Sequence, residues 1–455
     1  MFSNLLELVF LYLLFLKSPN CSDVPGISGA NGDVINDVMY VVGGLDLLDF
    51  TEDEDINESN SNSKVYYIDL RKGMDLNNDQ EKDWEFDFLI DQPLNRLLYH
   101  NVIKKDNNSE DLLIIGGMLT PLEESVKVFN TKTKTWKIDP VGSQFIKNLN
   151  FTKSGDSHLS YGPFASTLTR NDLNPDELIL FGGGYTSEKM KEEAGEGAYH
   201  GLVIYNTKYD KWRTVGENSQ YSIGTHNSVI HNGNLMLFGG VDTPSNEFIG
   251  FDTIVSFNIK DEKWHNQTTS GEFPSIRSIF GLKKVNNLVY ILGGTDDQNV
   301  ERFTDSSLYV LNLDSLTWEK YYIPGLVSTI LGYLEHYNGY LLYGFGLRLE
   351  LYSKMQIISL NNYTLVNRLP SAKEMEESKP KSQVSTIVSG SIGGLVGVIL
   401  LIALTYFLYK KLKQYRIVKK VPLTIPEPTH SNTVFIIKDP NFMLDDDEPE
   451  FDQTL

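Results

Sequence analysis

Short apolar runs that end in a pair of glycines recur along this chain. The clearest covers residues 289–294 and reads Val-Tyr-Ile-Leu-Gly-Gly. A polar loop follows it, then a second apolar run over residues 307–312, and then Trp318. Short runs that are rich in β-branched and aromatic residues and bounded by glycine predict strands. The stretch therefore predicts successive β-strands, with the tryptophan on the last of them.

The same order of features occurs four times before this stretch. The second glycines of the five pairs lie at positions 44, 117, 183, 240 and 294, at intervals of 73, 66, 57 and 54 residues. The chain has five tryptophans, which alternate with the glycine pairs: Trp84, Trp136, Trp212, Trp264 and Trp318. A sixth, degraded copy covers residues 340–361, with Val366 where a tryptophan would fall.

Repeats of this period cannot bury their apolar faces alone, so they must stack on one another. The apolar strand ending in Gly-Gly, the aromatic-rich strand ending in Asn or Asp, and the Trp of the outer strand together resemble the kelch family. That resemblance covers residues 27–369 and implies an all-β, six-bladed kelch-type β-propeller with one repeat per blade. For the ring to close, the first blade takes its missing strand from residues 27–35, or side contacts alone seal the ring.

We assign the glycines and tryptophans to the scaffold, because glycine permits positive φ at crowded turns and tryptophan fills the wedge between sheets. Binding is expected in the loops after the glycine pairs and after the Trp strands, which kelch propellers carry on one face. The candidate binding residues are aromatic, arginine and histidine side chains in these loops or near the starts of the innermost strands: Tyr185, Tyr199, His200, Arg302, Phe303, Arg96, His158, Tyr161, His226 and Arg277. The last two also match the ordinary kelch consensus, where their role would be structural.

Catalytic chemistry has little support in the sequence. The copper radical oxidases that share the kelch repeat need a Tyr-Cys crosslink, and the single cysteine here is Cys21, close to the N-terminus. His226 and His231 fall on opposite faces of a predicted strand, so neither a metal site nor a cofactor is expected. The alternative is a lumenal carbohydrate-active, isomerase-like enzyme that uses Arg, Glu and His residues of the central channel. Convergence of such residues on one pocket would favour it.

Two apolar segments outside the repeats predict a membrane topology. Residues 8–16 have the length of a signal-peptide core, which assigns residues 1–20 to a signal peptide. After a stalk over residues 370–386, residues 387–409 carry no charge and are long enough to cross a bilayer as a helix. Six basic residues follow between positions 410 and 420 and place that side in the cytoplasm.

Acceptor sequences for N-glycosylation agree with this topology. They occur at Asn20, Asn57, Asn107, Asn150, Asn266 and Asn362, all before the predicted span. We expect glycans at the five that lie beyond the signal peptide. The sequence thus predicts a type I single-pass glycoprotein in the secretory pathway, at the plasma membrane or an endomembrane.

The remaining predictions concern partners and the tail. A net charge of −20 disfavours nucleic acid, so the propeller is interpreted as a protein- or glycan-binding module in cell-surface organisation, polarity or trafficking. Small-residue spacing within the span predicts a homodimer through Gly390, Gly393, Gly394 and Gly397. Residues 410–455 are expected to be a disordered cytoplasmic tail. In it, Tyr415 and Val418 match a tyrosine-based sorting signal.

Overall fold

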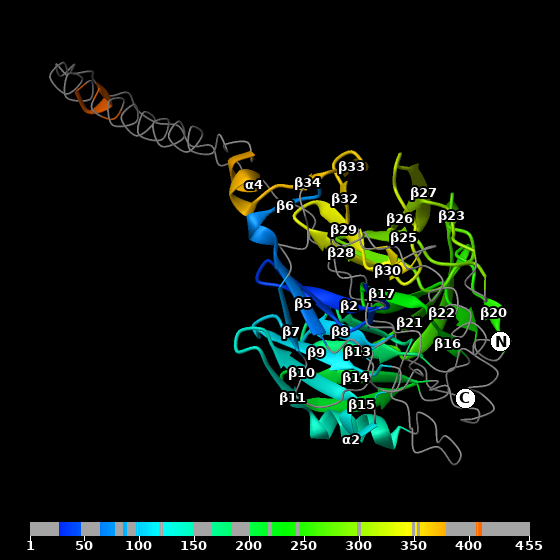
Figure 1. Cartoon of the computed structure of the whole chain (residues 1–455). Helices are drawn as coiled ribbons and strands as arrows, with labels where there is room; N and C mark the ends of the chain where they lie inside the picture. The colour runs from blue at the N-terminus through cyan, green and yellow to red at the C-terminus, as the bar shows by residue number, and fades with distance from the viewer. Residues whose placement is uncertain are drawn as a thin grey trace, which may run out of the picture. The chain divides into compact units, whose positions relative to one another are not determined.

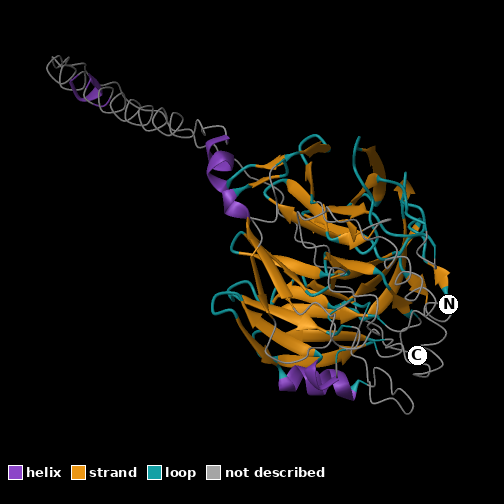
Figure 2. Cartoon of the chain, viewed as in Figure 1, coloured by secondary structure: helices purple, strands orange, loops and turns teal. Residues whose placement is uncertain are grey.

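Six sheets, five of them four-stranded and antiparallel and one with an additional short parallel strand, make up most of this computed structural model (Figures 1 and 2). It describes residues 27–46, 64–77, 85–88, 97, 99–117, 120, 122–149, 165–183, 201–216, 221–242, 245–297, 302–347, 351–352, 355–378, 406 and 408–411. The chain divides into two units at residue 378, and all the strands belong to the first.

Each sheet is one blade, built from consecutive strands in the order inner to outer. Blade 1 contains β2 (Asn31–Ile35), β3 (Val38–Val42), β5 (Lys64–Asp69) and β7 (Glu85–Phe88). Blade 2 contains β8 (Asn101–Lys104), β9 (Asp111–Ile115), β10 (Val126–Asn130) and β11 (Thr135–Ile138). Blade 3 contains β12 (Thr167–Arg170), β13 (Glu177–Phe181), β14 (Leu202–Asn206) and β15 (Lys211–Val215).

The other three blades repeat this order. Blade 4 contains β17 (Asn227–His231), β18 (Asn234–Phe238), β21 (Thr253–Asn258) and β22 (Lys263–Thr268). Blade 5 contains β24 (Gly281–Val285), β25 (Leu288–Leu292), β26 (Ser307–Asn312) and β27 (Thr317–Tyr322). Blade 6 contains β28 (Tyr333–Tyr337), β29 (Tyr340–Gly344), β32 (Gln356–Ser359) and β33 (Thr364–Val366). The predicted all-β architecture with six repeats is confirmed.

Shorter elements decorate the blades. The short strands are β1 (Ile27–Ser28), β4 (Leu45–Asp46), β6 (Met74–Asp75), β16 (Ile223–Gly224), β19 (Val241–Asp242), β20 (Glu247–Phe248), β23 (Ser270–Gly271), β30 (Gly346–Leu347), β31 (Leu351–Tyr352) and β34 (Arg368–Leu369). The helices are η1 (Leu70–Lys72), η3 (Leu122–Glu124), α2 (Pro140–Asn148) and α4 (Ala372–Ser378). The sequence analysis did not predict α2, whose N-terminus is capped by the Asp139 carboxylate.

A hydrophobic cluster fills each of the six interfaces between neighbouring blades. The predicted role of the tryptophans is confirmed where they are described. Trp318 of blade 5 is 2% exposed and meets Phe238 and Phe251 of blade 4 edge-on, at 6.3 and 5.9 Å between ring centroids. Trp212 stacks on Tyr205 at 4.2 Å within the cluster between blades 2 and 3. Trp84 lies outside the described residues.

The sixth copy contains one error of register in the sequence analysis. In blade 5, Trp318 pairs with Leu311 across β26 and β27, one position inside the Asn312–Thr317 pair that ends the hairpin. In blade 6 the equivalent terminal pair is Ser359 with Thr364, so the residue in the place of the tryptophan is Leu365 rather than Val366. Leu365 packs in the cluster between blades 5 and 6, as the geometry requires.

Of the two predicted alternatives, the first describes the ring, and side contacts alone do not seal it. Residues 31–35 supply the innermost strand of blade 1, and a hydrophobic cluster joins blade 1 to blade 6. In addition, β34 leaves blade 6 and pairs with β6 of blade 1 through Arg368–Asp75 and Leu369–Met74 (Figure 1). This clasp passes so close to Gly73, at φ +77°, that a Cβ there would lie 2.6 Å from the carbonyl oxygen of Leu369.

Candidate functional site

The six innermost strands surround a central channel with a cavity of about 480 Å³. One end of the channel is formed by the residues that lie two positions before the start of each innermost strand. All six of these residues have left-handed backbone conformations: Gly29, Tyr99, Ala165, Thr225, Ile279 and Leu331. Their backbone groups form a belt, in which Leu331 N donates to Ile279 O at 2.9 Å and Ile279 N donates to Thr225 O at 3.2 Å. The same bond links Thr225 to Ala165, Ala165 to Tyr99 and Gly29 to Leu331. The belt therefore holds the inner edges of neighbouring blades together.

A layer of polar side chains lies next to the belt. Asn101 Nδ2 donates to Ser166 Oγ of the next blade at 2.7 Å, and Asn227 Nδ2 donates to the carbonyl of Phe280 at 2.8 Å. Asn31 Nδ2 likewise donates to the carbonyl of His100 at 3.2 Å. These amides are engaged in holding adjacent blades at a fixed spacing, which makes them part of the scaffold.

Further from the belt, charged side chains occupy one wall of the channel. Asp33 of blade 1, Lys283 of blade 5 and Glu335 of blade 6 each stand four residues after the belt residue of their blade. Lys283 Nζ forms an ion pair with Glu335 Oε1, and Tyr333 Oη donates to Glu335 Oε2 at 2.6 Å. The Asp33 carboxylate accepts the backbone N–H groups of its neighbour in the chain, at 2.8 Å, and of Lys104, at 2.7 Å.

The opposite wall of the channel is uncharged at the same level. There the equivalent positions of blades 2, 3 and 4 are Ile103, Thr169 and Val229. Arg170 follows directly, but its guanidinium donates to backbone carbonyls, at 2.6 Å for Pro175 O and 3.2 Å for Lys105 O. The channel therefore has a charged wall from blades 5, 6 and 1 and a largely apolar wall from blades 2 to 4.

Burial and neighbouring charge set the protonation of the charged wall. Burial raises the pKa of Asp33, the nearby charge of Glu335 raises it further, and Lys283 only partly opposes them. Burial alone would lower the pKa of Lys283, but the two carboxylates outweigh it and raise that pKa. The wall thus holds two carboxylates beside one ammonium that stays protonated.

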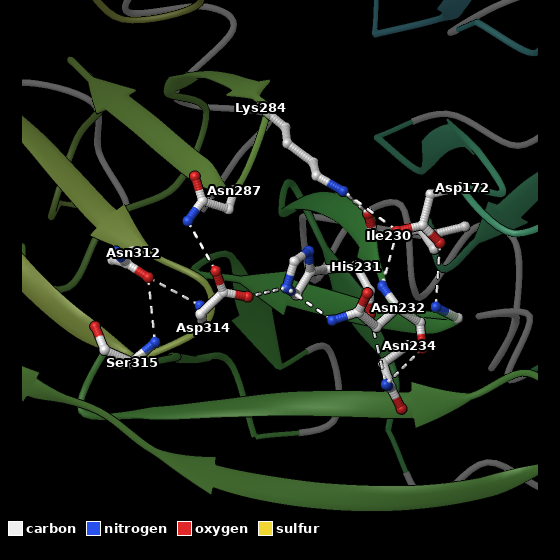
Figure 3. A network of polar contacts seen from close by, with 11 residues as sticks. Asp172, Ile230, His231, Asn232, Asn234, Lys284, Asn287, Asn312, Asp314 and Ser315 are labelled. Atoms are coloured by element: carbon white, nitrogen blue, oxygen red, sulfur yellow. Dashed lines mark hydrogen bonds and ion pairs between the residues drawn. The ribbon is translucent and has the colours of Figure 1, made fainter. Parts of the chain in front are cut away.

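At the far end of the channel, where the inner hairpins turn, a polar network joins three blades (Figure 3). Asp172 of blade 3 accepts the backbone N–H groups of Asn232 and Gly233 of blade 4 at 2.8 and 3.1 Å, and Lys284 of blade 5 lies 3.4 Å from it. In the same view His231 Nε2 lies 3.1 Å from Asp314 Oδ1. These contacts fasten the hairpins of blades 3, 4 and 5 to one another.

Two of the predicted binding residues are buried. Arg277 is 0% exposed and lies over the ring of Tyr309, with 5.0 Å between the guanidinium carbon and the ring centroid. Its guanidinium donates to the carbonyl of Gly293 at 3.0 Å, to Ser275 Oγ at 3.0 Å and to Asp305 Oδ1 at 3.2 Å. His226 is 4% exposed, with Nε2 3.1 Å from Thr167 Oγ1. Both side chains make contacts inside the scaffold in this structure, and neither lies on an exposed loop face.

Asp305 completes an ion-pair cluster above Arg277. Its second oxygen accepts from Tyr309 Oη at 2.9 Å and lies 2.8 Å from Lys320 Nζ. Burial raises the pKa of Asp305, but hydrogen bonds from Lys320, Ser307 and Tyr309 and the charge of Arg277 outweigh burial and lower it. Arg277, Asp305 and Lys320 thus form a fully paired structural base beneath the loops at this end of blade 5.

The exposed residues around this base were partly predicted. Arg302 is exposed, with Nε 2.6 Å from Asp296 Oδ1, and Phe303 is half-buried next to it. The sequence analysis missed three large apolar side chains nearby, Phe273, Ile276 and Tyr322, which are 46%, 45% and 78% exposed. The only signal for them was an aromatic or aliphatic residue inside an otherwise polar loop or outer strand.

The arrangement of the chain brings these residues to one end of blade 5. Before Phe273 the chain runs parallel to the outer strand, with Ser270 opposite Thr317 and Gly271 opposite Trp318. At the end of the same outer strand, Tyr322 lies opposite Ser307. Arg277 then joins the two segments through Ser275 and Asp305. We call Phe273, Ile276, Arg302, Phe303 and Tyr322 the blade-5 patch.

Several predicted sites fall outside the described residues. Among the binding candidates these are Arg96, His158, Tyr161, Tyr185, Tyr199 and His200. The same holds for Asn57 and Asn150, for Tyr415 and Val418, for the glycines of residues 390–397, and for the signal peptide over residues 1–20. Of the predicted transmembrane segment, only residues 406, 408 and 409 are described, and no helix in the described part of the chain is long and apolar enough to cross a membrane.

The other three glycosylation candidates are exposed. Asn107 lies in the inner hairpin of blade 2, Asn266 on the outermost strand of blade 4, and Asn362 in the outer hairpin of blade 6. At the last of these, Thr364 Oγ1 donates to Asn362 Oδ1 at 2.9 Å, which brings the two reactive groups of the acceptor sequence together. Within the described ranges, no group of three His, Cys, Asp or Glu side chains is arranged to hold a metal ion.

Six four-stranded sheets around a lined channel define the class of the protein as a repeat scaffold of the β-propeller type. Comparison with known proteins agrees, because residues 100–330 and, in an overlapping match, residues 166–391 match the family described as KLHDC2/KLHL20/DRC7 Kelch-repeats domain. The chain belongs to this kelch-repeat family. The kelch domain suggests a protein-binding module, and kelch-repeat relatives are typically non-enzymatic binding proteins.

Individual relatives are more distant. The chain is 25% identical to Kelch domain-containing protein 10 of Mus musculus over 189 residues. The aligned stretch covers 40% of this chain and 42% of the mouse protein. It is 26% identical over 153 residues to Kelch-like protein 40 of Xenopus tropicalis, over 32% of this chain and 22% of that protein. The matched region thus spans less than half the length of either relative.

Proposed function

We propose that this protein is a non-enzymatic binding module that captures a protein partner on the blade-5 patch. The observation that carries the proposal is the exposure of Phe273, Ile276 and Tyr322 around the ion pair of the buried Arg277 with Asp305. Aromatic and arginine side chains contribute most of the energy in protein interfaces. A stiff base lowers the conformational entropy lost on binding, because the side chains are already held in place.

The charges around the patch favour one kind of partner. Glu272 and Glu319 are exposed, and Asp296 lies beside Arg302, within a chain of net charge −20. Such surroundings repel anions and attract cationic side chains. We therefore propose a partner that presents apolar residues flanked by lysine or arginine.

The same proposal includes how the module is presented. The uncharged residues 387–409 and the basic residues behind them support a single-pass membrane protein with the propeller outside the cytoplasm. The exposed acceptor sequences at Asn107, Asn266 and Asn362 support a glycoprotein. Digestion of the cell-derived protein with an N-glycosidase tests both, since a lumenal propeller should lose mass and an Asn362→Gln variant should lose one step of that shift. An unchanged mass would contradict the topology.

Proximity labelling tests the patch. Full-length protein with a labelling tag is compared with a Phe273→Ser, Ile276→Ser, Tyr322→Ser variant and with Tyr209→Ser, whose side chain is 64% exposed on blade 3. We expect a set of labelled proteins to be shared by the parent and Tyr209→Ser and absent from the triple variant. Reconstituted with the purified partner, the triple variant should bind at least about tenfold more weakly, or about 1.4 kcal/mol. Identical labelled sets would overturn the proposal.

A carbohydrate-active enzyme in the channel is the second candidate. It is favoured by the pair of carboxylates Asp33 and Glu335, with the pKa of Asp33 raised as a general acid requires. Against it, Arg170 is engaged with backbone carbonyls, and His226 is buried against Thr167 and Phe181. The arginine and histidine that an isomerase of this type would use are therefore already engaged in contacts within the scaffold, and we favour the binding module.

A further inference from the structure

The channel has the properties of a small-molecule site that is separate from the blade-5 patch. Its cavity of about 480 Å³ falls within the range of ligand pockets, roughly 300–1,000 Å³. All six blades contribute to its lining, yet at the level of Asp33 the lining is asymmetric, with charge only on the wall from blades 5, 6 and 1.

The charged wall has an excess of negative groups. Lys283 is paired with Glu335, whereas among the described residues only backbone N–H groups donate to Asp33. A carboxylate oxygen has two lone pairs, so each oxygen of Asp33 keeps capacity for a further donor. The nearest additional cation, Arg170, uses its guanidinium on carbonyl oxygens.

The facing wall supplies apolar contact. Ile103 and Val229 stand at the level of Asp33 and line the cavity. Burial of alkyl carbon against such side chains contributes about 0.8 kcal/mol for each CH₂ group. A ligand that matches both walls has one positive group and a compact apolar body.

Access to the cavity is from the hairpin end. At the belt end, the lining residues Asn101 and His226 are 4% exposed. Toward the hairpins, the side chains of Lys283 and Asp172 are 30% and 28% exposed. Lys283 is thus the part of the charged wall that reaches solvent, because the side chain of Glu335 is 3% exposed.

We infer that the channel binds a small organic cation, an aliphatic amine whose ammonium group lies at Asp33 and Glu335 and whose alkyl body packs against Ile103 and Val229. The ammonium donates hydrogen bonds to the Asp33 carboxylate, and the Lys283–Glu335 pair is retained. A metal ion fits less well, because the described residues hold no group of three suitable ligands.

Calorimetric titration of the purified full-length protein tests this inference with n-butylammonium, 1-butanol and butyrate as probes. We expect saturable binding of n-butylammonium, weaker binding of 1-butanol and none of butyrate. Asp33→Asn should weaken n-butylammonium binding at least about tenfold, because it removes the charge that the ammonium faces. Asp314→Asn, at the hairpin end but outside the lining of the cavity, is the matched control and should leave the affinity unchanged.

Three outcomes would overturn the inference: no saturable binding of n-butylammonium, equal binding of the alcohol and the amine, or equal affinity of Asp33→Asn and the parent. Circular dichroism and the urea unfolding midpoint establish that each variant is folded. If Asp33→Asn does not fold, Thr169→Lys replaces it, since this change adds a cation on the facing wall and leaves the hydrogen bonds of Asp33 intact. Thr169→Lys should abolish amine binding, and retained binding would count against the site.

Discussion

The two charged clusters of this protein are assembled over very different distances along the chain. The cluster beneath the blade-5 patch is local, since Arg277 reaches Ser275, Gly293 and Asp305, the last of them 28 positions away. The channel cluster joins Asp33 of the first blade to Glu335 of the last, and it exists only because the ring closes. In the first cluster every charge is paired, while in the second a carboxylate faces a cavity.

This difference separates a supporting role from a binding role. A buried ion pair with all its hydrogen bonds made holds loops rigidly and exposes none of its own charge. A carboxylate at a cavity wall instead retains capacity for a ligand. The loops of blade 5 therefore present a surface built on a local frame, whereas the channel site depends on the geometry of the whole propeller.

Removal of Arg277 should have the largest effect. Arg277→Ala removes a fully buried side chain together with its hydrogen bonds to Asp305 and to the carbonyl of Gly293, so we expect a loss of about 3 kcal/mol of unfolding free energy. Urea denaturation measures it. Arg302→Ala is the control, because an exposed ion pair contributes at most about 1 kcal/mol. Equal losses for the two variants would show that Arg277 is not the support of the patch.

A change at the ring closure should have an intermediate effect and act on the channel alone. Gly73→Ala places a Cβ 2.6 Å from Leu369 O at φ +77°, which should cost about 2 kcal/mol and open the β6–β34 clasp. Gly339→Ala is the control, since its φ is +85° but nothing lies within 4 Å of the added Cβ. We expect Gly73→Ala, and not Gly339→Ala, to weaken amine binding in the calorimetric titration. Unchanged amine affinity would mean that the channel does not depend on closure.

The smallest effect should appear in the pH dependence, where the two clusters are expected to differ in sign. The pKa of Asp305 is lowered in the folded protein, so its contribution is present above its unfolded value near 3.8 and is lost as pH falls. The pKa of Asp33 is raised, so the folded protein loses stability as pH rises from about 3.8 through the raised value. Relative to the parent, Asp33→Asn should therefore gain stability with rising pH, and Asp305→Asn should lose it. Unfolding free energies between about pH 2 and pH 8 measure both, and parallel curves would contradict the assignment.

Much of the fold could be predicted because its signals are local. Each Gly-Gly pair comes at the end of a strand whose apolar residues are consecutive in the sequence. Trp318 packs between blades 4 and 5, as its position in the repeat predicts. The register of blade 6 was misjudged by one residue because no tryptophan marks it, and only the Ser359–Thr364 pairing shows that Leu365 takes that place. Local pattern determines elements well, but a degraded copy leaves the register open.

The site was predicted less completely. The sequence pointed to Arg302 and Phe303 beside the glycine pair of blade 5, but it could not show that Arg277 is covered while Phe273 and Tyr322 are exposed. An arginine near a loop has the same local pattern whether it points outward or inward. Its direction is decided by partners such as Asp305, which the chain brings close only after the blade has formed.

The repeat period alone determines how many blades stack and which residues fill the spaces between them, because five of the six interfaces join blades that are consecutive in the chain. The meeting of Asp33, Lys283 and Glu335 has no such local origin. It depends on the accumulated twist of six sheets, which returns the last blade to the first and directs three ordinary strand residues into one cavity. For that reason the scaffold could be read from the amino-acid order, and the channel site became visible only in the closed ring.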